Sequence, residues 1–164
     1  MPTQKTILYA YSAGSYDGGL VESIFNPHSI TIVRSDSSQK VLDMVSQSKF
    51  DLILTDVLLA PGYGAHDERL MEIFRGFKSK QAYGEIALYF IRRVREQVLN
   101  SQTPIVIATT VDENNSGILP DAKRRALEAG ANIYVNLFIR EDGYNLLERV
   151  LLKELGLEER LALH

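Results

Sequence analysis

A carboxylate at the end of an apolar stretch is the residue best placed for chemistry in this sequence. The segment Phe50–Leu59 reads FDLILTDVLL, in which an apolar run from Leu52 to Leu54 ends on Thr55 and Asp56. Such a run is typical of a buried strand in a parallel sheet. Ligands of open α/β sheets bind beyond the carboxyl ends of the strands, so Asp56 is expected at the functional end of the fold. Its carboxylate could help to hold an oxygen-liganded ion such as magnesium, or simply cap the next turn.

A second candidate site is the glycine-containing loop before the first predicted helix. Gly14 and Gly19 bracket four residues, as in a loop that cradles a phosphate group. The Lys and the Ser or Thr expected after such a loop are replaced by Leu20 and Val21. Backbone amides at a helix start can still bind an anion, so a nucleotide- or anion-binding domain that uses Gly14–Gly19 is one alternative. The other is that the glycines only permit a tight turn.

Composition and charge exclude several classes of function. The 164 residues, 45% hydrophobic and 24% charged, suit one globular domain. With no Cys and three scattered His, disulfide scaffolds, thiolate chemistry and zinc-ligand sets are excluded. A net charge of -3 argues against a nucleic-acid partner. No signal peptide or membrane-spanning run is visible, so we expect a cytoplasmic protein with no membrane contact.

Alternating apolar and helical patterns predict βαβ units and hence a parallel sheet. The predicted strands are Thr6–Tyr11, Ser29–Arg34, Asp51–Asp56, Pro104–Thr109 and Asn132–Asn136. The predicted helices are Gly19–Phe25, Ser37–Ser48, Gly84–Leu99, Asp121–Ala129 and Gly143–Leu155. Ser37 is placed to cap its helix, and Gly130 stands where a helix ends with a left-handed residue.

The connection after the third predicted strand is too long for an ordinary loop. Residues 60–83 fill it, whereas strand-to-helix loops usually take about 2 to 6 residues. Apolar and charged residues alternate there with helical spacing, which predicts an extra amphipathic helix. Leu70, Phe74 and Phe77 on this inserted segment could form a recognition surface for a protein partner, or pack on the domain body. The expected hinges of the segment are Gly62, Gly64, Gly76 and Gly84.

Three segments resemble the receiver domain of bacterial two-component response regulators, and the likeness spans nearly the whole chain. FDLILTDVLLAPGYG is similar to the strand that carries the phosphoacceptor, here Asp56, and to its following Pro-Gly turn. TPIVIATT is similar to the fourth strand, which ends in the hydroxyl residue that contacts the phosphoryl group, here Thr109. ALEAGANIYVN is similar to the end of the fourth helix and the fifth strand. The resemblance implies a flavodoxin-like, doubly wound, five-stranded parallel sheet of order 2-1-3-4-5, with the inserted helix after strand 3.

The sequence departs from the receiver pattern at the two features that phosphorylation chemistry needs. Receivers place two adjacent acids after the first strand to hold magnesium, whereas Tyr11 and Ser12 stand here. Receivers also end the fifth strand with a Lys, whereas the matching residue here is Leu137, followed by Phe138. Phosphoryl transfer to a carboxylate depends on charge neutralisation, so these degenerate positions predict that standard phosphorylation of Asp56 is lost.

Magnesium binding is possible but is not expected to be tight. Because Mg²⁺ usually keeps several waters and needs only one or two carboxylates, Asp56 could still hold it weakly together with Asp17 or Asp112. No other cofactor is expected. The alternative that follows is a phosphorylatable receiver that uses Asp56, in which any enzymatic activity would be self-phosphorylation or dephosphorylation at that residue.

The sequence therefore predicts a stand-alone pseudo-receiver that acts by protein–protein interaction in two-component or phosphorelay signalling. The receiver-like domain spans residues 1–156, with the insertion at 60–83 and a short tail at 157–164. Leucines in the last predicted helix indicate either a long core helix or a homodimer interface. Basic clusters at 92–95 and 123–125 are interspersed with acids and are interpreted as solvated faces.

Overall fold

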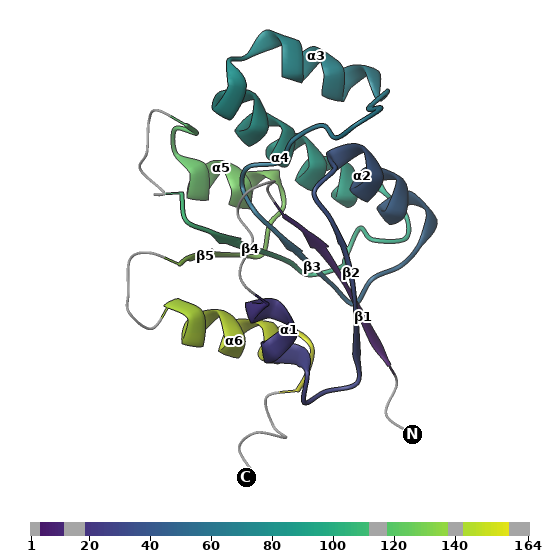
Figure 1. Ribbon diagram of the computed structural model, residues 1–164, viewed down its shortest axis with the longest axis vertical. Helices are drawn as coiled ribbons and strands as arrows, with labels where there is room; N and C mark the ends of the chain where they lie inside the picture. The colour runs from purple at the N-terminus through teal and green to yellow at the C-terminus, as the bar shows by residue number, and fades with distance from the viewer. Residues whose placement is uncertain (1–3, 12–18, 112–117, 138–142, 158–164) are drawn as a thin grey trace.

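The five predicted strands form one parallel sheet. The structure is a computed structural model that describes residues 4–11, 19–111, 118–137 and 143–157. The strands are β1 (Lys5–Ala10), β2 (Ile30–Ser35), β3 (Leu52–Thr55), β4 (Ile105–Thr109) and β5 (Ile133–Asn136). They lie in the order β2-β1-β3-β4-β5, which confirms the predicted flavodoxin-like fold class and strand order (Figure 1).

Helices cover both faces of the sheet, as Figure 1 shows. The helices are α1 (Leu20–Phe25), α2 (Ser38–Gln47), α3 (Glu68–Gly76), α4 (Ser79–Glu96), α5 (Ala122–Ala129) and α6 (Gly143–Glu154). α1 and α6 lie on one face, and α2, α4 and α5 lie on the other, with α3 packed on the outside of α4. The inserted segment therefore contains the predicted extra helix and adds a partial third layer.

Successive side chains of a strand point to opposite faces of the sheet, so the interior is divided into two hydrophobic clusters. In β3, Ile53 contributes to the cluster beneath α2, α4 and α5, whereas Leu52 and Leu54 contribute to the cluster beneath α1 and α6. All four β3 residues are buried, because side chains that alternate between two covered faces leave none in water. This burial on both faces is why the strand reads as an unbroken apolar run.

Helix α4 begins five residues before the predicted start, at Ser79. Gly84 is therefore an interior helix residue and not a hinge. A Cβ at this position would lie 3.1 Å from Cδ1 of Leu119, so its missing side chain permits close contact with the segment that precedes α5. The prediction was wrong here because a glycine within a polar stretch suggests a helix boundary.

Two predicted helix termini are confirmed. The side chain of Ser37 accepts a hydrogen bond from the backbone amide of Lys40 at 3.2 Å and so caps α2. Gly130 ends α5 with φ of 127°, and the amide of Ala131 donates to the carbonyl of Ala126.

A polar hub, formed by Asn100 and Thr103, holds the end of the sheet at which β3 and β4 begin. The fully buried Asn100 accepts hydrogen bonds through Oδ1 from the amide of Phe50 and the hydroxyl of Thr103, both at 3.0 Å. Its Nδ2 donates to the carbonyls of Val45 and Ser48 at 2.8 and 2.7 Å. Every side-chain polar atom of Asn100 is thus satisfied, which offsets the cost of removing it from water.

The leucines of α6 belong to the core of the domain. Leu147, Leu151 and Leu152 are buried in the cluster shared with α1, and Leu146 and Val150 pack against it. Of the two roles predicted for these leucines, the structure shows the core role, and the homodimer through this helix stays a prediction.

The helix ends in a Schellman motif that extends the folded domain by one residue. The amide of Gly156, at φ of 70°, donates to the carbonyl of Lys153, and the amide of Leu157 donates to that of Leu152. Leu157 is buried, so it packs with the domain and not with the predicted tail. Within the described ranges, none of the helices is long and apolar enough to cross a membrane.

Candidate functional site at the end of strand β3

Asp56 lies directly after β3, at the edge of the sheet where the sequence predicts it. Its backbone amide donates to the carbonyl of Ala10 at 3.0 Å, which continues the pairing between β1 and β3. The carboxylate Oδ1 accepts hydrogen bonds from the amides of Val57 at 2.6 Å and Leu58 at 3.3 Å. Asp56 therefore caps the turn after β3, which is one of the two roles considered for it.

Thr109 is brought to the same carboxylate from the neighbouring strand. Its hydroxyl donates to Oδ1 of Asp56 at 2.8 Å and accepts a hydrogen bond from the amide of Val111 at 3.1 Å. Thr109 is buried, whereas Asp56 is half-buried. Because β3 and β4 are parallel neighbours, their carboxyl ends meet, and the predicted phosphoacceptor-like and phosphoryl-contact-like residues lie side by side.

The position that holds a Lys in receivers does not bring a cation to this site. The amide of Leu137 donates to the carbonyl of Thr109 at 2.9 Å, and its side chain packs against the cluster formed by α1 and α6. An aliphatic side chain cannot pair with an anionic oxygen. At this position the chain therefore has an apolar side chain, Leu137, that packs in the core, where receivers have the charged side chain of a Lys.

Two polar side chains of β5 join the site indirectly, and sequence reasoning missed both. The hydroxyl of Tyr134 and Nδ2 of Asn136 donate to the carbonyl of Val111 at 3.0 and 3.3 Å. They tie the segment after β4 to β5, beside the Thr109 that contacts Asp56. The polar Asn136 at the end of an otherwise apolar strand was the available signal.

Several predicted site residues lie outside the described part of the chain. These are Ser12, Asp17, Asp112 and the loop from Gly14 up to residue 18. Tyr11 is described: its amide donates to the carbonyl of Ser35, and its ring centroid lies 5.6 Å from that of Tyr9. Among the described residues, no three His, Asp or Glu side chains gather as a metal-binding group.

The inserted segment is held to the domain by a polar anchor that the sequence analysis did not identify. Asp67 caps α3 by accepting the amide of Leu70 at 2.9 Å, and its carboxylate also accepts the hydroxyl of Tyr89 on α4 at 3.0 Å. Oε1 of Gln39 on α2 accepts the amides of His66 and Asp67 at 2.9 and 2.8 Å. Burial and the bond to Asp67 raise the pKa of Tyr89. An Asp before an amphipathic run was a usable signal for the cap.

The structure corrects one expectation about the insertion. Leu70 is fully buried on the inner side of α3 and is part of the core, so it cannot contact a partner. Gly62 packs closely against the start of α2, because a Cβ at this position would lie 2.0 Å from Oγ of Ser37, and its role as a hinge stays a prediction. Phe74 and Phe77 remain 38% and 46% exposed.

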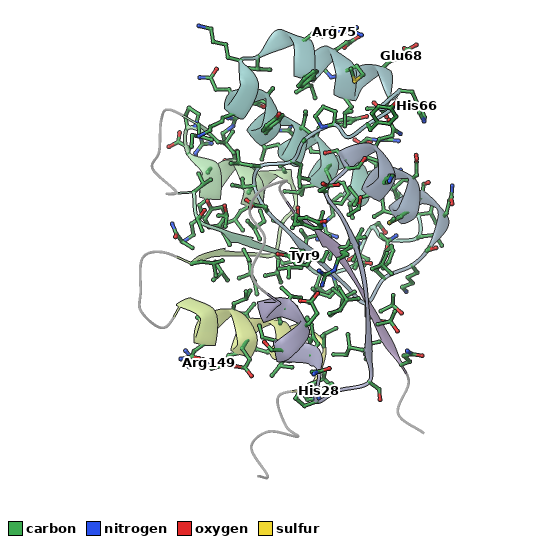
Figure 2. The ribbon with its side chains drawn as sticks, in the orientation of Figure 1. Tyr9, His28, His66, Glu68, Arg75 and Arg149 are labelled. Atoms are coloured by element: carbon green, nitrogen blue, oxygen red, sulfur yellow. The ribbon has the colours of Figure 1, made fainter. Side chains whose placement is uncertain are left out.

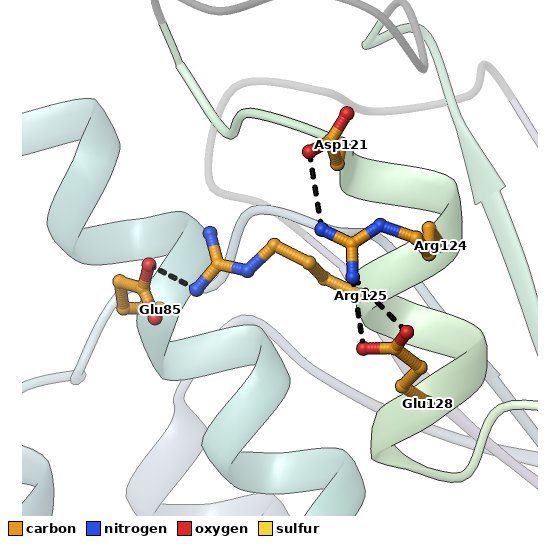
Figure 3. A network of polar contacts seen from close by, with 5 residues as sticks. All are labelled: Glu85, Asp121, Arg124, Arg125 and Glu128. Atoms are coloured by element: carbon orange, nitrogen blue, oxygen red, sulfur yellow. Dashed lines mark hydrogen bonds and ion pairs between the residues drawn. The ribbon is translucent and has the colours of Figure 1, made fainter.

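The basic clusters are engaged by neighbouring groups of the domain. Arg124 contacts Asp121 and Glu128, and Arg125 on α5 bonds Glu85 on α4 at 2.6 Å (Figure 3). Arg95 is a structural residue instead of a surface charge: it donates to the carbonyls of Gly130 and Thr103 and to Oδ1 of Asn132. Burial lowers the pKa of Arg95.

The fold is similar to that of several solved receiver domains. One belongs to a sensor histidine kinase of Pseudomonas aeruginosa and has magnesium coordinated in its active site cleft; the TM-score is 0.60 and the identity 16%, over 94% of this chain and 99% of that chain. For a signal receiver domain of a histidine kinase from Clostridium thermocellum, the TM-score is 0.64 and the identity 17%, over 93% of this chain and 98% of that chain. For a chemotaxis response regulator of Vibrio cholerae, the TM-score is 0.59 and the identity 17%, over 90% of this chain and 99% of that chain.

No sequence-family model matches the chain, and no curated protein matches it in sequence. The likeness to the solved structures is therefore one of fold. It confirms the fold expected from the three sequence segments: the chain has the fold of receiver domains.

Proposed function

We propose that this receiver-like domain acts in two-component signalling through contact with a protein partner, without standard phosphorylation of Asp56. One observation carries the proposal: Oδ1 of Asp56 accepts three hydrogen bonds from the domain itself. The carboxylate is thereby used as a structural acceptor that joins the tips of β3 and β4.

The residues around the carboxylate support the same conclusion. Transfer of a phosphoryl group to Asp56 would bring anionic oxygens against an anion, and catalysis of that step rests on positioning and neutralisation of charge. Leu137 supplies no cation, and Tyr11 and Ser12 supply no carboxylate for a magnesium ion. A domain with these three substitutions retains the receiver architecture as a binding scaffold.

A second candidate function is a phosphorylatable receiver, and one observation favours it. The hydroxyl of Thr109 lies 2.8 Å from the Asp56 carboxylate, where it could contact a phosphoryl group after rotation about its side-chain bond. Magnesium would then be held by Asp56 with Asp17 or Asp112. Such a site would rely on carboxylates alone, without the Lys that receivers place at the end of the fifth strand.

Treatment with acetyl phosphate and magnesium, followed by intact-mass and peptide mass spectrometry, separates the two functions. We expect no phosphoaspartate. An Asp56→Asn variant serves as the matched control, because a modification lost in this variant identifies the residue. Phosphorylation of the wild-type protein at Asp56, absent from the control, would establish the second candidate.

The partner contact is proposed at the exposed aromatic side chains of the inserted segment, Phe74 and Phe77. Their exposure and the rigid anchoring of α3 support this location, because preorganised aromatic residues make effective binding anchors. Substitution of each by Ser, with capture of native partners as the readout, tests it. Unchanged capture by a double variant of wild-type stability would refute the location.

A further inference from the structure

The outer face of α3 carries charges of both signs along a shallow groove. Ala65, His66, Glu68, Met71, Glu72 and Arg75 line this groove, whose volume is about 430 Å³. Figure 2 shows His66, Glu68 and Arg75 at the outer edge of the molecule, away from the sheet. Glu68, Glu72 and Arg75 are exposed, and Met71 is half-buried between them and the core.

The two ends of this face carry opposite charges, Glu68 at the start of the helix and Arg75 near its end. Glu72 is paired with Arg69 at 3.0 Å, but neither Glu68 nor Arg75 makes an ion pair within the described part of the chain. They are seven residues apart, which places them on the same face of the helix, two turns or about 10 Å from each other. A partner for this face therefore needs a positive group and a negative group at that same spacing.

The face is also a rigid platform. On the opposite side of α3, Leu70 and Ile73 are buried in the core. At its start, Asp67 is bonded both to the helix and to Tyr89 of α4. Because rotation of the helix would break these contacts, they set the backbone positions of Glu68 and Arg75 relative to the domain.

We propose that the outer face of α3 binds a second copy of this chain about a two-fold axis. When two α3 helices lie antiparallel, Glu68 of each copy faces Arg75 of the other, and both ion pairs form at once. The axis passes midway between these residues, so Met71 of one copy lies next to Met71 of the other. An isologous contact of this kind requires a self-complementary surface, and the positions of Glu68 and Arg75 meet that requirement. The same axis brings the two Glu72 side chains together, and Arg69 of each copy, which pairs with Glu72 at 3.0 Å, offsets their charge.

The expected dimer is weak. The helix has 9 residues, so its length is about 14 Å, and one such pair of helices forms an interface at or below the small end of specific contacts. Charge complementarity would then contribute mainly to orientation and to the association rate. Association should accordingly depend on protein and salt concentration, and should involve a surface distinct from α6.

The test uses sedimentation velocity on the purified full chain between about 10 µM and about 1 mM, a range in which weak dimers are populated. Glu68→Arg and Arg75→Glu are examined separately and as an equimolar mixture. Arg149→Glu is the matched control, because Arg149 is exposed on α6, across the sheet from α3 (Figure 2). Circular dichroism checks that each variant is folded.

We expect the wild-type protein and the Arg149→Glu variant to dimerise alike. Each α3 variant alone should lose at least about tenfold in affinity, because like charges then face each other. The mixture should recover dimers, since both ion pairs of a mixed dimer join an arginine of the Glu68→Arg variant to a glutamate of the Arg75→Glu variant. A monomeric wild-type protein, single variants that still dimerise, or a mixture that does not recover would each overturn the proposal.

Discussion

The hydroxyl of Thr109 and Oδ1 of Asp56 are joined by a hydrogen bond of 2.8 Å across the tips of two neighbouring strands. The amide of Val111 donates to the same hydroxyl, so the bond belongs to a chain of donors that ends on the carboxylate. Asp56 matches the residue that accepts a phosphoryl group in receivers. In this domain its carboxylate accepts hydrogen bonds instead, and through Thr109 it holds the segment after β4.

Replacement of Asp56 should reveal this structural role. Asp56→Asn keeps an oxygen that can accept the three hydrogen bonds, so we expect a loss in the free energy of unfolding of about 1 kcal/mol. Asp56→Ala removes the acceptor and should cost about 2 to 3 kcal/mol. Urea unfolding of the two variants measures the difference. Equal stabilities would show that the three bonds contribute little.

Magnesium at about 1 mM should leave the melting temperature unchanged. A ligand that binds only the native state must stabilise it, and we expect Tyr11, Ser12 and Leu137 to have removed the groups that make magnesium binding tight. The control is sodium chloride at the same ionic strength. A rise in melting temperature with magnesium alone would contradict the expectation and direct attention to Asp17, Asp56 and Asp112.

Two apolar residues of α3 should differ sharply in their effect on stability. Leu70→Ala removes a fully buried side chain and should cost about 2 to 5 kcal/mol. Phe74→Ala removes a side chain that is 38% exposed and should cost less. Thermal and urea unfolding give both values. Equal costs would mean that Phe74 contributes as much to the core as Leu70.

Gly62 and Gly64 form a matched pair within the insertion. Both have positive φ, 92° and 73°, but a Cβ at Gly62 would clash with Ser37, whereas a Cβ at Gly64 would have open space around it in the described part of the chain. Gly64→Ala should therefore cost about 1 kcal/mol from backbone strain alone. Gly62→Ala should cost several times more, or displace the segment from α2. Denaturant unfolding measures both, and a similar small cost would show that this segment can shift freely.

Alkaline pH should weaken the anchor of the insertion. The pKa of Tyr89 is raised in the folded protein by burial and by its bond to Asp67, so folding favours the neutral phenol. Its contribution to stability is complete below the unfolded pKa of about 10 and is lost as pH rises through the folded pKa. Stability measured between about pH 8 and 11 should fall less steeply in Tyr89→Phe than in the wild-type protein, and parallel curves would contradict this.

Each strand was predicted to within one residue at each end. β3 and β4 are the clearest cases, because burial on both faces makes their sequences almost continuously apolar. The pairing of Asp56 with Thr109 was also predictable, since parallel neighbours end at the same edge of a sheet. The start of α4 was not, because the polar sequence near Gly84 resembles a break until the contact with Leu119 is known.

Hydrogen bonds that side chains make with groups far away in sequence escaped prediction. Asp67 and Tyr89 are 22 residues apart, and Gln39 reaches His66 across 27. No local pattern encodes such pairs, because their distance is set by how α2, α3 and α4 pack together. The buried position of Leu70 was ambiguous for the same reason: helical spacing defines an apolar face without saying what covers it.

The hub at Asn100 bears on the order in which this domain assembles. Its bonds reach Val45 and Phe50, which are 55 and 50 residues away, so the hub forms only after the chain has closed a long loop that contains β3 and the whole insertion. Closing such a loop costs entropy before its contacts form. Asn100 should therefore act late in folding and chiefly slow the escape from the native state. This end of the sheet would then govern the lifetime of the fold, whereas Asp56 lies at the opposite end.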